Sequence, residues 1–479
     1  MSELKEPLIL LLALFMNFTT PKNDRREIFG WLMYDWANSA FYTTVVSVLA
    51  GPYITALAQE DVCNKLNNIP GCENGTVLDL GFLGAVTASS LFTTALALAI
   101  LVQVFFLPIL GSIADYTHLK KRLMAIFCYA GVAASGLLFF VKGDSYIWGS
   151  LLLMFSIMCF AAANVFYNAF LVDISTEDRR DRISSYGFAA GYLGGVIILV
   201  LNLLMINNAD TLGLDRGLAV RLSMLSASLW WGLFSIVTFV SIKQRSAIKE
   251  NTHEKSLVII GFSEVWETLK ELKRLRYTML FLAAYLFYND GIQSVILNSS
   301  VFLSNELFDS GARKNSQGFL LGIFLIAQIS ALVGAILFER LSRVIGAKRT
   351  ILVALFIWCC IVVFAYGFLE TTLQAQIMSV FIGLVLGSAQ ALSRSLYSQM
   401  IPVGRESAFF GLYEISEKGT SWMGNLVFGI VVASTGSYRQ AILAIIVFFF
   451  VGSILLLFTD TKRAIHEAGN RTPEEATEA

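Results

Sequence analysis

The stretch LVQVFFLPILGSIADYTHLKKRLMAIFCYA (residues 101–130) decides the fold class. An apolar run ends at the carboxylate Asp115. A polar junction with the basic cluster 120–122 follows, and a second apolar run begins directly after it. A membrane-spanning helix needs about 20 apolar residues, and over such lengths in hydrocarbon only a helix satisfies its own backbone hydrogen bonds. The stretch therefore predicts two transmembrane helices joined by a short polar turn.

The same alternation continues along the whole chain. Of the 479 residues, 56% are hydrophobic and 15% are charged, whereas soluble domains carry roughly 25% charged residues. This composition predicts an all-α membrane protein with twelve transmembrane helices. The predicted spans are Ile28–Leu57, Ala85–Ile113, Leu123–Val141, Tyr146–Val172, Ser185–Ile206, Leu218–Ile242, Tyr277–Leu303, Phe319–Leu341, Thr350–Leu369, Gln376–Met400, Ala408–Ala433 and Ala441–Phe458.

The basic residues predict the orientation of these helices. With the N-terminus inside, 26 of the 35 lysines and arginines fall in inside segments and seven in outside loops. Because cytoplasmic loops of membrane proteins are enriched in lysine and arginine, both termini are expected in the cytoplasm. The apolar run Pro7–Phe18 is short for a span; we interpret it as part of a cytoplasmic tail or an interfacial helix, and a signal peptide is the alternative.

The spans divide into two sets of six. We expect a cytoplasmic tail (1–27), an N-terminal six-helix bundle (28–242), a cytoplasmic linker (243–276) with a surface helix over 262–276, a C-terminal six-helix bundle (277–459) and a cytoplasmic tail (460–479). Three motifs recur in order in the two halves: YDWANS (34–39) with YNDGIQS (288–294), GSIADYTHLKKR (111–122) with FERLSRVIGAKR (338–349), and SYGFAAGYLGG (185–195) with FFGLYEISEKG (409–419). Two parallel six-helix halves are typical of the major facilitator fold.

Several function classes are excluded or disfavoured by the sequence. The formal net charge is zero, which argues against a nucleic-acid partner. No phosphate-binding glycine-rich motif, catalytic triad or metal-ligand spacing is present, so we expect no enzyme activity, no metal and no cofactor. Cys63 and Cys72 lie nine residues apart in an outside loop; a disulfide and a free pair both remain open.

Asp290 is the most prominent candidate for function. It lies midway along the seventh span with Asn289 beside it and Gln293 near it on one face. A charge in hydrocarbon costs roughly 2.5–3.5 kcal/mol even on lenient scales, so an intramembrane carboxyl indicates a binding or coupling role. A structural carboxyl bonded to a neighbouring helix is the alternative.

A second candidate lies in the first span. Asp35, Asn38 and Ser39 share one helical face at spacings of three and four residues, and Tyr34 adjoins them. This polar stripe predicts either a substrate site near the cytoplasmic mouth or a clamp between helices. In the fourth span, the same spacing brings together the predicted cavity residues Asn164, Tyr167 and Asn168.

The remaining charged groups predict latches and gates at the cytoplasmic ends of the helices. Asp115 is expected to pair with Lys121 and Arg122, and Asp173 to face the basic turn 179–182. In the eleventh span, Glu414 is expected to pair with Lys418 four residues on, and Glu417 with Arg394 of the tenth span.

Two levels of resemblance follow from these motifs. GSIADYTHLKKR resembles the cytoplasmic signature between helices two and three of the major facilitator superfamily, with Gly111 and Asp115 at matching positions and Tyr116 in place of its first basic residue. Within that superfamily the chain resembles the fungal autophagy-linked vacuolar effluxers, on GWLMYDWANSAF (30–41), VFYNAFLVDIS (165–175), LFYNDGIQS (286–294), SRSLYSQMIP (393–402) and FFGLYEISEKGTS (409–421). The likeness extends from about residue 30 to residue 458.

The resemblance implies amino acids as a substrate class, since the fungal relatives are linked to amino-acid export from the vacuole. The segment DWANSAF (35–41) is similar to the corresponding segment of prokaryotic members of this family, which implies a bacterial plasma membrane. In a eukaryote, the expected location is a vacuolar or lysosomal membrane. We therefore expect a secondary transporter for a small polar solute, working by efflux or with protons. A membrane sensor without transport and an amphiphile transporter are the alternatives.

Overall fold

The computed structural model describes residues 22–67, 69–79, 81, 85–115, 119–243, 257–308, 317–418 and 422–478. The apolar run 7–18 lies outside this part of the chain. Within it the protein is an all-helical membrane fold of two six-helix halves, apart from one small hairpin.

The N-terminal half begins with a long first span. Helix α2 (Arg25–Ala40) continues through the π-helix η1 (Phe41–Leu49) into α3 (Ala50–Lys65), so this span reaches beyond the predicted 28–57 at both ends. The half is completed by α4 (Leu91–Asp115), α5 (Lys120–Leu137) with the 3-10 turn η5 (Leu138–Phe140), α6 (Tyr146–Ile174), the turn η6 (Glu177–Arg179), α7 (Arg180–Asn207) and α8 (Arg216–Ser241).

The loop between α3 and α4 is closed by a disulfide between Cys63 and Cys72, which decides the question that the sequence left open. It also carries the turns η2 (Cys72–Asn74) and η4 (Ala88–Ser90). Strands β1 (Thr76–Asp79) and β2 (Ala85–Thr87) pair antiparallel beside them.

The C-terminal half follows an amphipathic helix, α9 (Leu257–Arg274), which corresponds to the surface helix predicted over 262–276. The half consists of α10 (Arg276–Leu307), α11 (Gln317–Ile345), α12 (Ala347–Gly367), α13 (Thr372–Gln399), α14 (Glu406–Lys418), α15 (Trp422–Thr435), α16 (Tyr438–Ala444) and α17 (Ile446–Phe458). Two short helices, α18 (Thr461–Glu467) and α19 (Pro473–Glu478), form the tail.

Eleven helical segments within the described residues are long and apolar enough to cross a membrane, and they match eleven of the twelve predicted spans. The remaining one, the eleventh span predicted over 408–433, is covered by α14 and α15. Each of these helices is shorter than a full span, and residues 419–421 between them lie outside the described part of the chain.

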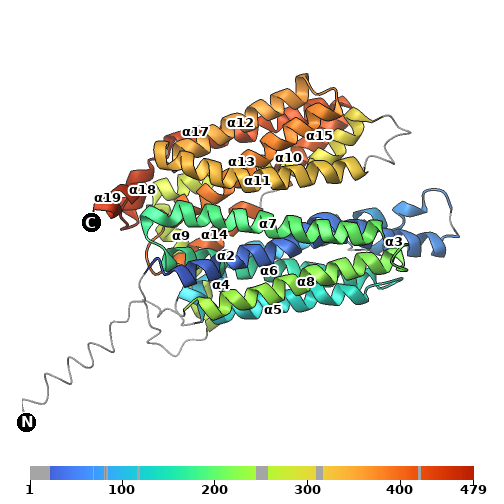
Figure 1. Ribbon diagram of the computed structural model, residues 1–479, viewed down its shortest axis with the longest axis horizontal. Coiled ribbons are helices and arrows are strands. Elements are labelled where there is room, and N and C mark those ends of the chain that lie inside the picture. Colours follow the sequence, from blue (N-terminus) through green and yellow to red (C-terminus); the bar gives the residue numbers. More distant parts are fainter. Residues whose placement is uncertain are drawn as a thin grey trace, which may run out of the picture.

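Figure 1 shows the two halves as neighbouring bundles whose helices run roughly along the long axis of the molecule. At one end α2 begins and α17 leads into α18 and α19; α9 also lies at this end. Basic residues such as Lys120, Arg180 and Lys348 begin or nearly begin helices here, so we call it the basic end. The opposite end, with the disulfide-closed loop, is the loop end.

Helices α2 and α7 approach each other closely because glycines of α7 face α2. A Cβ atom on Gly191 would lie 2.6 Å from Ser39 Oγ, and one on Gly194 would lie 2.5 Å from the carbonyl oxygen of Trp36. Small residues permit such backbone contact between membrane helices. The contact places the polar face of α2 against α7 and in reach of the other half.

Candidate functional site

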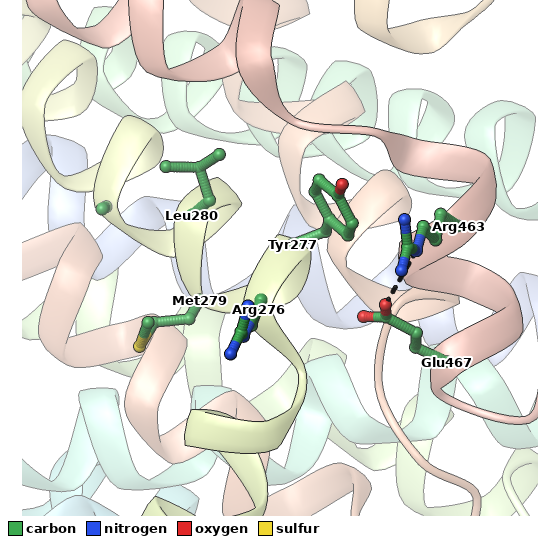
Figure 2. Close-up of a pocket in the computed structure, with 7 residues that line it drawn as sticks. Arg276, Tyr277, Met279, Leu280, Arg463 and Glu467 are labelled. Atoms are coloured by element: carbon green, nitrogen blue, oxygen red, sulfur yellow. Dashed lines mark hydrogen bonds and ion pairs between the residues drawn. The ribbon is translucent and has the colours of Figure 1, made fainter.

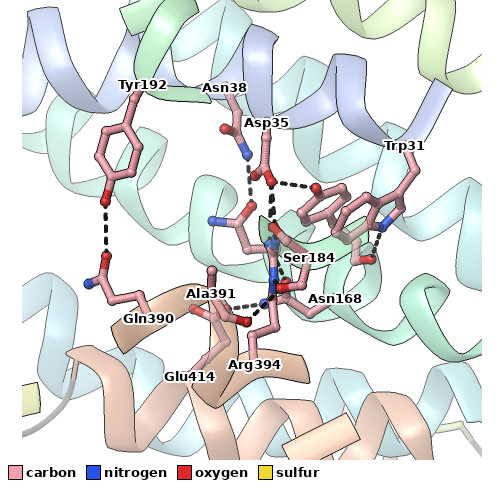
Figure 3. A network of polar contacts seen from close by, with 12 residues as sticks. Trp31, Asp35, Asn38, Asn168, Ser184, Tyr192, Gln390, Ala391, Arg394 and Glu414 are labelled. Atoms are coloured by element: carbon pink, nitrogen blue, oxygen red, sulfur yellow. Dashed lines mark hydrogen bonds and ion pairs between the residues drawn. The ribbon is translucent and has the colours of Figure 1, made fainter. Parts of the chain in front are cut away.

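Arg394 of α13 is the centre of a polar network that joins the two halves (Figure 3). Its guanidinium lies 3.3 Å from Asp35 Oδ2 on α2, and it donates at 2.9 Å to both the hydroxyl and the carbonyl oxygen of Ser184 on α7. A further N–H donates to Asn168 Oδ1 on α6 at 3.3 Å. Only 4% of the Arg394 side chain is exposed. One buried cation of the C-terminal half thus binds three helices of the N-terminal half.

Asp35 is the carboxylate that compensates this cation. The Tyr167 hydroxyl donates to the same oxygen, Asp35 Oδ2, at 2.6 Å, and 14% of the Asp35 side chain is exposed. Breaking a buried ion pair by removing one partner costs about 3–5 kcal/mol, because the other charge stays buried without compensation. Asp35 and Arg394 therefore stabilise each other and hold the halves together.

Aromatic rings enclose the guanidinium. Its central carbon lies 4.3 Å from the ring centre of Phe188, 4.8 Å from Trp31 and 5.5 Å from Tyr167. Trp31 stacks on Tyr167 and donates its indole N–H to the Tyr167 carbonyl at 2.9 Å. A cation over aromatic faces gains roughly 0.5–2 kcal/mol, more when water is excluded. The rings fix the guanidinium in position while keeping the site largely dry.

The predicted amides of α2 and α6 extend this network. Asn168 Nδ2 donates to Glu414 Oε1 on α14 at 2.8 Å, a second polar bridge between the halves. Asn38 Nδ2 donates to Asn164 Oδ1 at 3.0 Å, and the ring of Tyr34 packs 4.9 Å from that of Tyr167. The structure therefore brings the candidates of the first and fourth spans together with Arg394 and Glu414.

Asp290 lies apart from this network, on the face of α10 that contacts span eleven. Its Oδ2 accepts the backbone N–H of Gly424, in the first turn of α15, at 2.8 Å. Its Oδ1 has no hydrogen-bond partner within the described residues, and the side chain is fully buried. The nearby Ser294 hydroxyl is also buried and unpartnered within the same part of the chain.

Of the two predicted neighbours of Asp290, Asn289 makes a hydrogen bond to another helix and Gln293 does not. Asn289 Nδ2 donates to the carbonyl of Glu417 on α14 at 2.6 Å, so α10 binds backbone groups on both sides of residues 419–421. Gln293 is half-buried and makes no hydrogen bond within the described residues.

The predicted pairing of Asp115 with Lys121 and Arg122 is wrong. Asp115 instead accepts the backbone N–H groups of Ser407 at 2.9 Å and Ala408 at 2.8 Å, across the halves at the start of α14. The first N–H groups of a helix lack acceptors within it and attract an anion. Lys121 donates to the Ile242 carbonyl at 2.6 Å, and Arg122 is exposed.

Two further predicted partners differ in the structure. Asp173 forms its ion pair with Lys120, at 3.1 Å, while Arg180 of the turn 179–182 interacts with Asp173 only electrostatically and pairs with Glu177 at 3.0 Å. Arg394 pairs with Asp35 rather than with Glu417, since its side chain extends toward the N-terminal half. The predicted partner of Glu414, Lys418, has its side chain outside the described part of the chain.

Sequence patterns did not predict three contributors to the inter-half contact. Ser184 donates to the Ala391 carbonyl at 2.7 Å while accepting from Arg394, and Arg180 donates to the Ser398 carbonyl at 3.1 Å. Tyr192 donates to Gln390 Oε1 at 3.4 Å. All are on α7, and their partners are mostly backbone atoms, which leave no mark in the sequence. These bonds lie from the basic end to about the middle of α7.

Comparison with known proteins agrees with this architecture. Residues 23–469 match the family described as Vacuole effluxer Atg22 like. The uncharacterized MFS-type transporter YxiO of Bacillus subtilis is 32% identical over 450 residues, which cover 93% of this chain and 97% of that protein. Autophagy-related protein 22 of Kluyveromyces lactis is 24% identical, over 94% of this chain and 96% of its own.

Solved structures share the fold at low identity. The human organic anion transporter MFSD10 superimposes with a TM-score of 0.63 at 12% identity, over 90% of this chain and 99% of its own. A bacterial homologue of the iron transporter ferroportin, in an outward-facing state, gives 0.56 at 12% identity, over 91% and 99%. The chain therefore belongs to the Atg22-like family of the major facilitator superfamily, and it is a secondary transporter rather than an enzyme.

Proposed function

We propose that this transporter exports a small polar solute, with amino acids as the substrate class, in exchange for protons, and that its basic end faces the cytoplasm. The orientation is supported by the excess of lysine and arginine at that end. Export is supported by the family description, which names a vacuole effluxer, and the substrate class is supported by the chemistry of the Arg394 network.

In the proposed cycle the Arg394 network is the cytoplasmic gate. Bonds from α13 and α14 to α2, α6 and α7 hold the basic ends of the halves together. For this end to open, Arg394 must leave Asp35, Tyr167 and Ser184. Each of these groups then needs a new partner, because an uncompensated charge inside the membrane is costly.

An amino-acid zwitterion carries the two charges that replace this pair. Its carboxylate matches the forked donor geometry of Arg394, and its ammonium matches Asp35 and the amide oxygens nearby. A solute with both charges compensates both halves of the opened pair without adding net charge. We propose that the substrate competes with the Asp35–Arg394 contact and so favours opening.

The observation that carries proton coupling is the environment of Asp290. Its carboxyl is fully buried, binds one backbone N–H, and has no ion-pair partner among the described residues. A carboxylate in hydrocarbon without a cation costs roughly 2.5–3.5 kcal/mol or more. Loading a proton in one state and releasing it in the other would therefore tie the proton gradient to the change of state.

The test uses purified protein in proteoliposomes loaded with a labelled amino-acid mixture. The outside is made more acidic than the inside, so that protons entering the liposomes can drive release of the solute. Wild type is then expected to release label faster as this proton gradient becomes steeper. Asp290→Asn keeps an acceptor for the Gly424 N–H but cannot carry a proton, so it is expected to lose the response to the gradient. Asp144→Asn, in the exposed loop before α6, is the matched control and should behave as wild type.

Three outcomes would contradict parts of this proposal. Label movement unaffected by the gradient in wild type would remove proton coupling. A gradient response retained by Asp290→Asn would assign coupling to another group. Saturable binding of amino acids with no movement of label would mean that the protein senses amino acids and does not transport them.

A further inference from the structure

A pocket of about 420 Å³ lies at the basic end, and none of its lining residues belongs to the Arg394 network. Figure 2 shows the residues that line it. The first two turns of α10 supply Arg276, Tyr277, Met279, Leu280 and Ala283, and α18 supplies Arg463 and Glu467. The pocket thus lies where α10 enters the membrane and where the C-terminal tail contacts it.

The charges of this pocket are unbalanced. Arg463 pairs with Glu467 at 3.2 Å and lies 5.4 Å above the ring of Tyr277. Arg276 makes no ion pair or hydrogen bond within the described residues, and Lys273 and Arg274 precede it at the exposed end of α9. One free guanidinium therefore remains at the pocket mouth, with further cations beside it.

The wall of the pocket below Arg276 is apolar. Met279 is 44% exposed, and Leu280 and Ala283 are partly exposed on the same segment. At 1.5 Å per residue, Ala283 lies roughly 10 Å deeper along α10 than Arg276. Tyr277 stands between the two zones, as aromatic side chains with a polar tip do at membrane interfaces. The pocket is therefore cationic at the depth of lipid headgroups and apolar at the depth of acyl chains.

We propose that this pocket binds an anionic phospholipid. The phosphate would lie on Arg276, with Lys273 and Arg274 adding positive potential, and an acyl chain would run along Met279, Leu280 and Ala283. Basic pockets between membrane helices recognise anionic headgroups by this complementarity. Because α18 forms one wall, the bound lipid would also fix the tail against α10. The proposal does not depend on the transported substrate.

The test measures lipids retained by the purified protein in native mass spectrometry. Wild type, exchanged into mixed micelles with equal phosphatidylglycerol and phosphatidylcholine, is expected to retain one phosphatidylglycerol in preference. Arg276→Gln should weaken that preference about five-fold, the effect of one basic group at an anionic surface. Arg349→Gln, an exposed arginine at the start of α12, makes the same charge change outside the pocket and should retain the preference.

A second variant keeps the charge and removes the space. Ala283→Phe fills the apolar part and is expected to reduce retention of both lipids, while thermal unfolding midpoints of all variants stay near wild type. Equal retention of the two lipids by wild type would overturn the proposal. So would equal losses in Arg276→Gln and Arg349→Gln, or binding of glycerol 3-phosphate as tight as that of the lipid, which would indicate a site for free anions.

Discussion

Asp35 and Asp290 stand at corresponding places in the two halves, within YDWANS (34–39) and YNDGIQS (288–294), yet their surroundings are opposite. Asp35 contacts the guanidinium of Arg394 and accepts the hydroxyl of Tyr167. Asp290 is more deeply buried and accepts a single backbone N–H, from Gly424. One carboxylate has its counter-charge in place, and the other has none among the described residues.

The difference arises from the helix that faces each acid. Arg394 on α13 reaches across the halves to Asp35. Asp290 instead faces the start of α15, which carries no charged side chain, so this helix supplies no cation to Asp290. An internal repeat can therefore preserve the position of an acid while changing its electrostatic role: a gate in one half and, in our proposal, a proton carrier in the other.

Removing Arg394, the counter-charge of Asp35, is expected to have the largest effect on stability. Arg394→Met leaves Asp35 buried without its cation and should lower the free energy of unfolding by about 3–5 kcal/mol. The measurement is denaturant unfolding in micelles, followed by tryptophan fluorescence. In the double variant Asp35→Asn with Arg394→Met, both charges are gone, so much of the loss should be recovered. Equal losses in the single and double variants would show that the two charges are not coupled.

A pair of glycines offers a smaller, steric perturbation of the same two acids. A Cβ atom on Gly187 would lie 2.5 Å from Asp35 Oδ2 and 3.0 Å from Arg394 Nη2, whereas one on Gly424 would meet chiefly Ser294 and lie 3.3 Å from Asp290 Oδ2. Gly187→Ala should cost about 1–3 kcal/mol of unfolding free energy, as overpacking does. Gly424→Ala should cost less, because its nearest contact is the Ser294 hydroxyl, which makes no hydrogen bond within the described residues and can move aside.

Gly429→Ala on α15 is the control for both glycine variants. Apart from the backbone of its own helix, no described heavy atom lies within 4 Å of its added Cβ, and alanine exceeds glycine in helix propensity by about 1 kcal/mol. It should therefore be neutral or stabilising in the same unfolding measurement. A Gly424→Ala variant less stable than Gly187→Ala would mean that the Asp290 region is the more tightly packed of the two.

Substituting Asp290 itself should have a small effect on stability, in contrast to Arg394. In Asp290→Asn an amide oxygen still accepts the Gly424 N–H, and no buried cation among the described residues loses its partner. We expect the free energy of unfolding to change by no more than about 1 kcal/mol. A loss as large as that of Arg394→Met would identify Asp290 as a structural carboxyl, the alternative that its sequence context leaves open.

The sequence predicts the spans of this fold better than the partners within the site. Twenty apolar residues suffice to predict a span, and helical spacing groups Asp35 with Asn38 and Asn164 with Asn168. Spacing on one helix carries no information about another, however, so the contact between Asp35 and Arg394, 359 residues apart, was missed. Asp115 accepts backbone N–H groups, which have no sequence signature, so the pairing with Lys121 and Arg122 that the sequence predicts is wrong.

The smallest expected effect concerns Asp24, a carboxyl outside the membrane that serves as a reference for the pH dependence of Asp290. Asp24 Oδ1 accepts the backbone N–H of Arg26 at 2.9 Å and Oδ2 pairs with Lys243 at 3.0 Å. These contacts, the backbone N–H first, lower the pKa of Asp24 below the ordinary value of an aspartate. A lowered pKa gives a contribution to stability that is present above the ordinary value and disappears as the pH falls through the lowered one.

Asp24 therefore stays ionised throughout the range from about pH 5 to about pH 8, well above the ordinary pKa of an aspartate. Asp24→Asn should leave the dependence of flux on pH in that range unchanged, measured as initial rates in proteoliposomes, whereas Asp290→Asn should flatten it. If Asp24→Asn flattened the profile as well, the pH dependence would follow the charge at the basic end and not a proton carried inside the membrane. Proton carriage would then no longer distinguish Asp290 from Asp35.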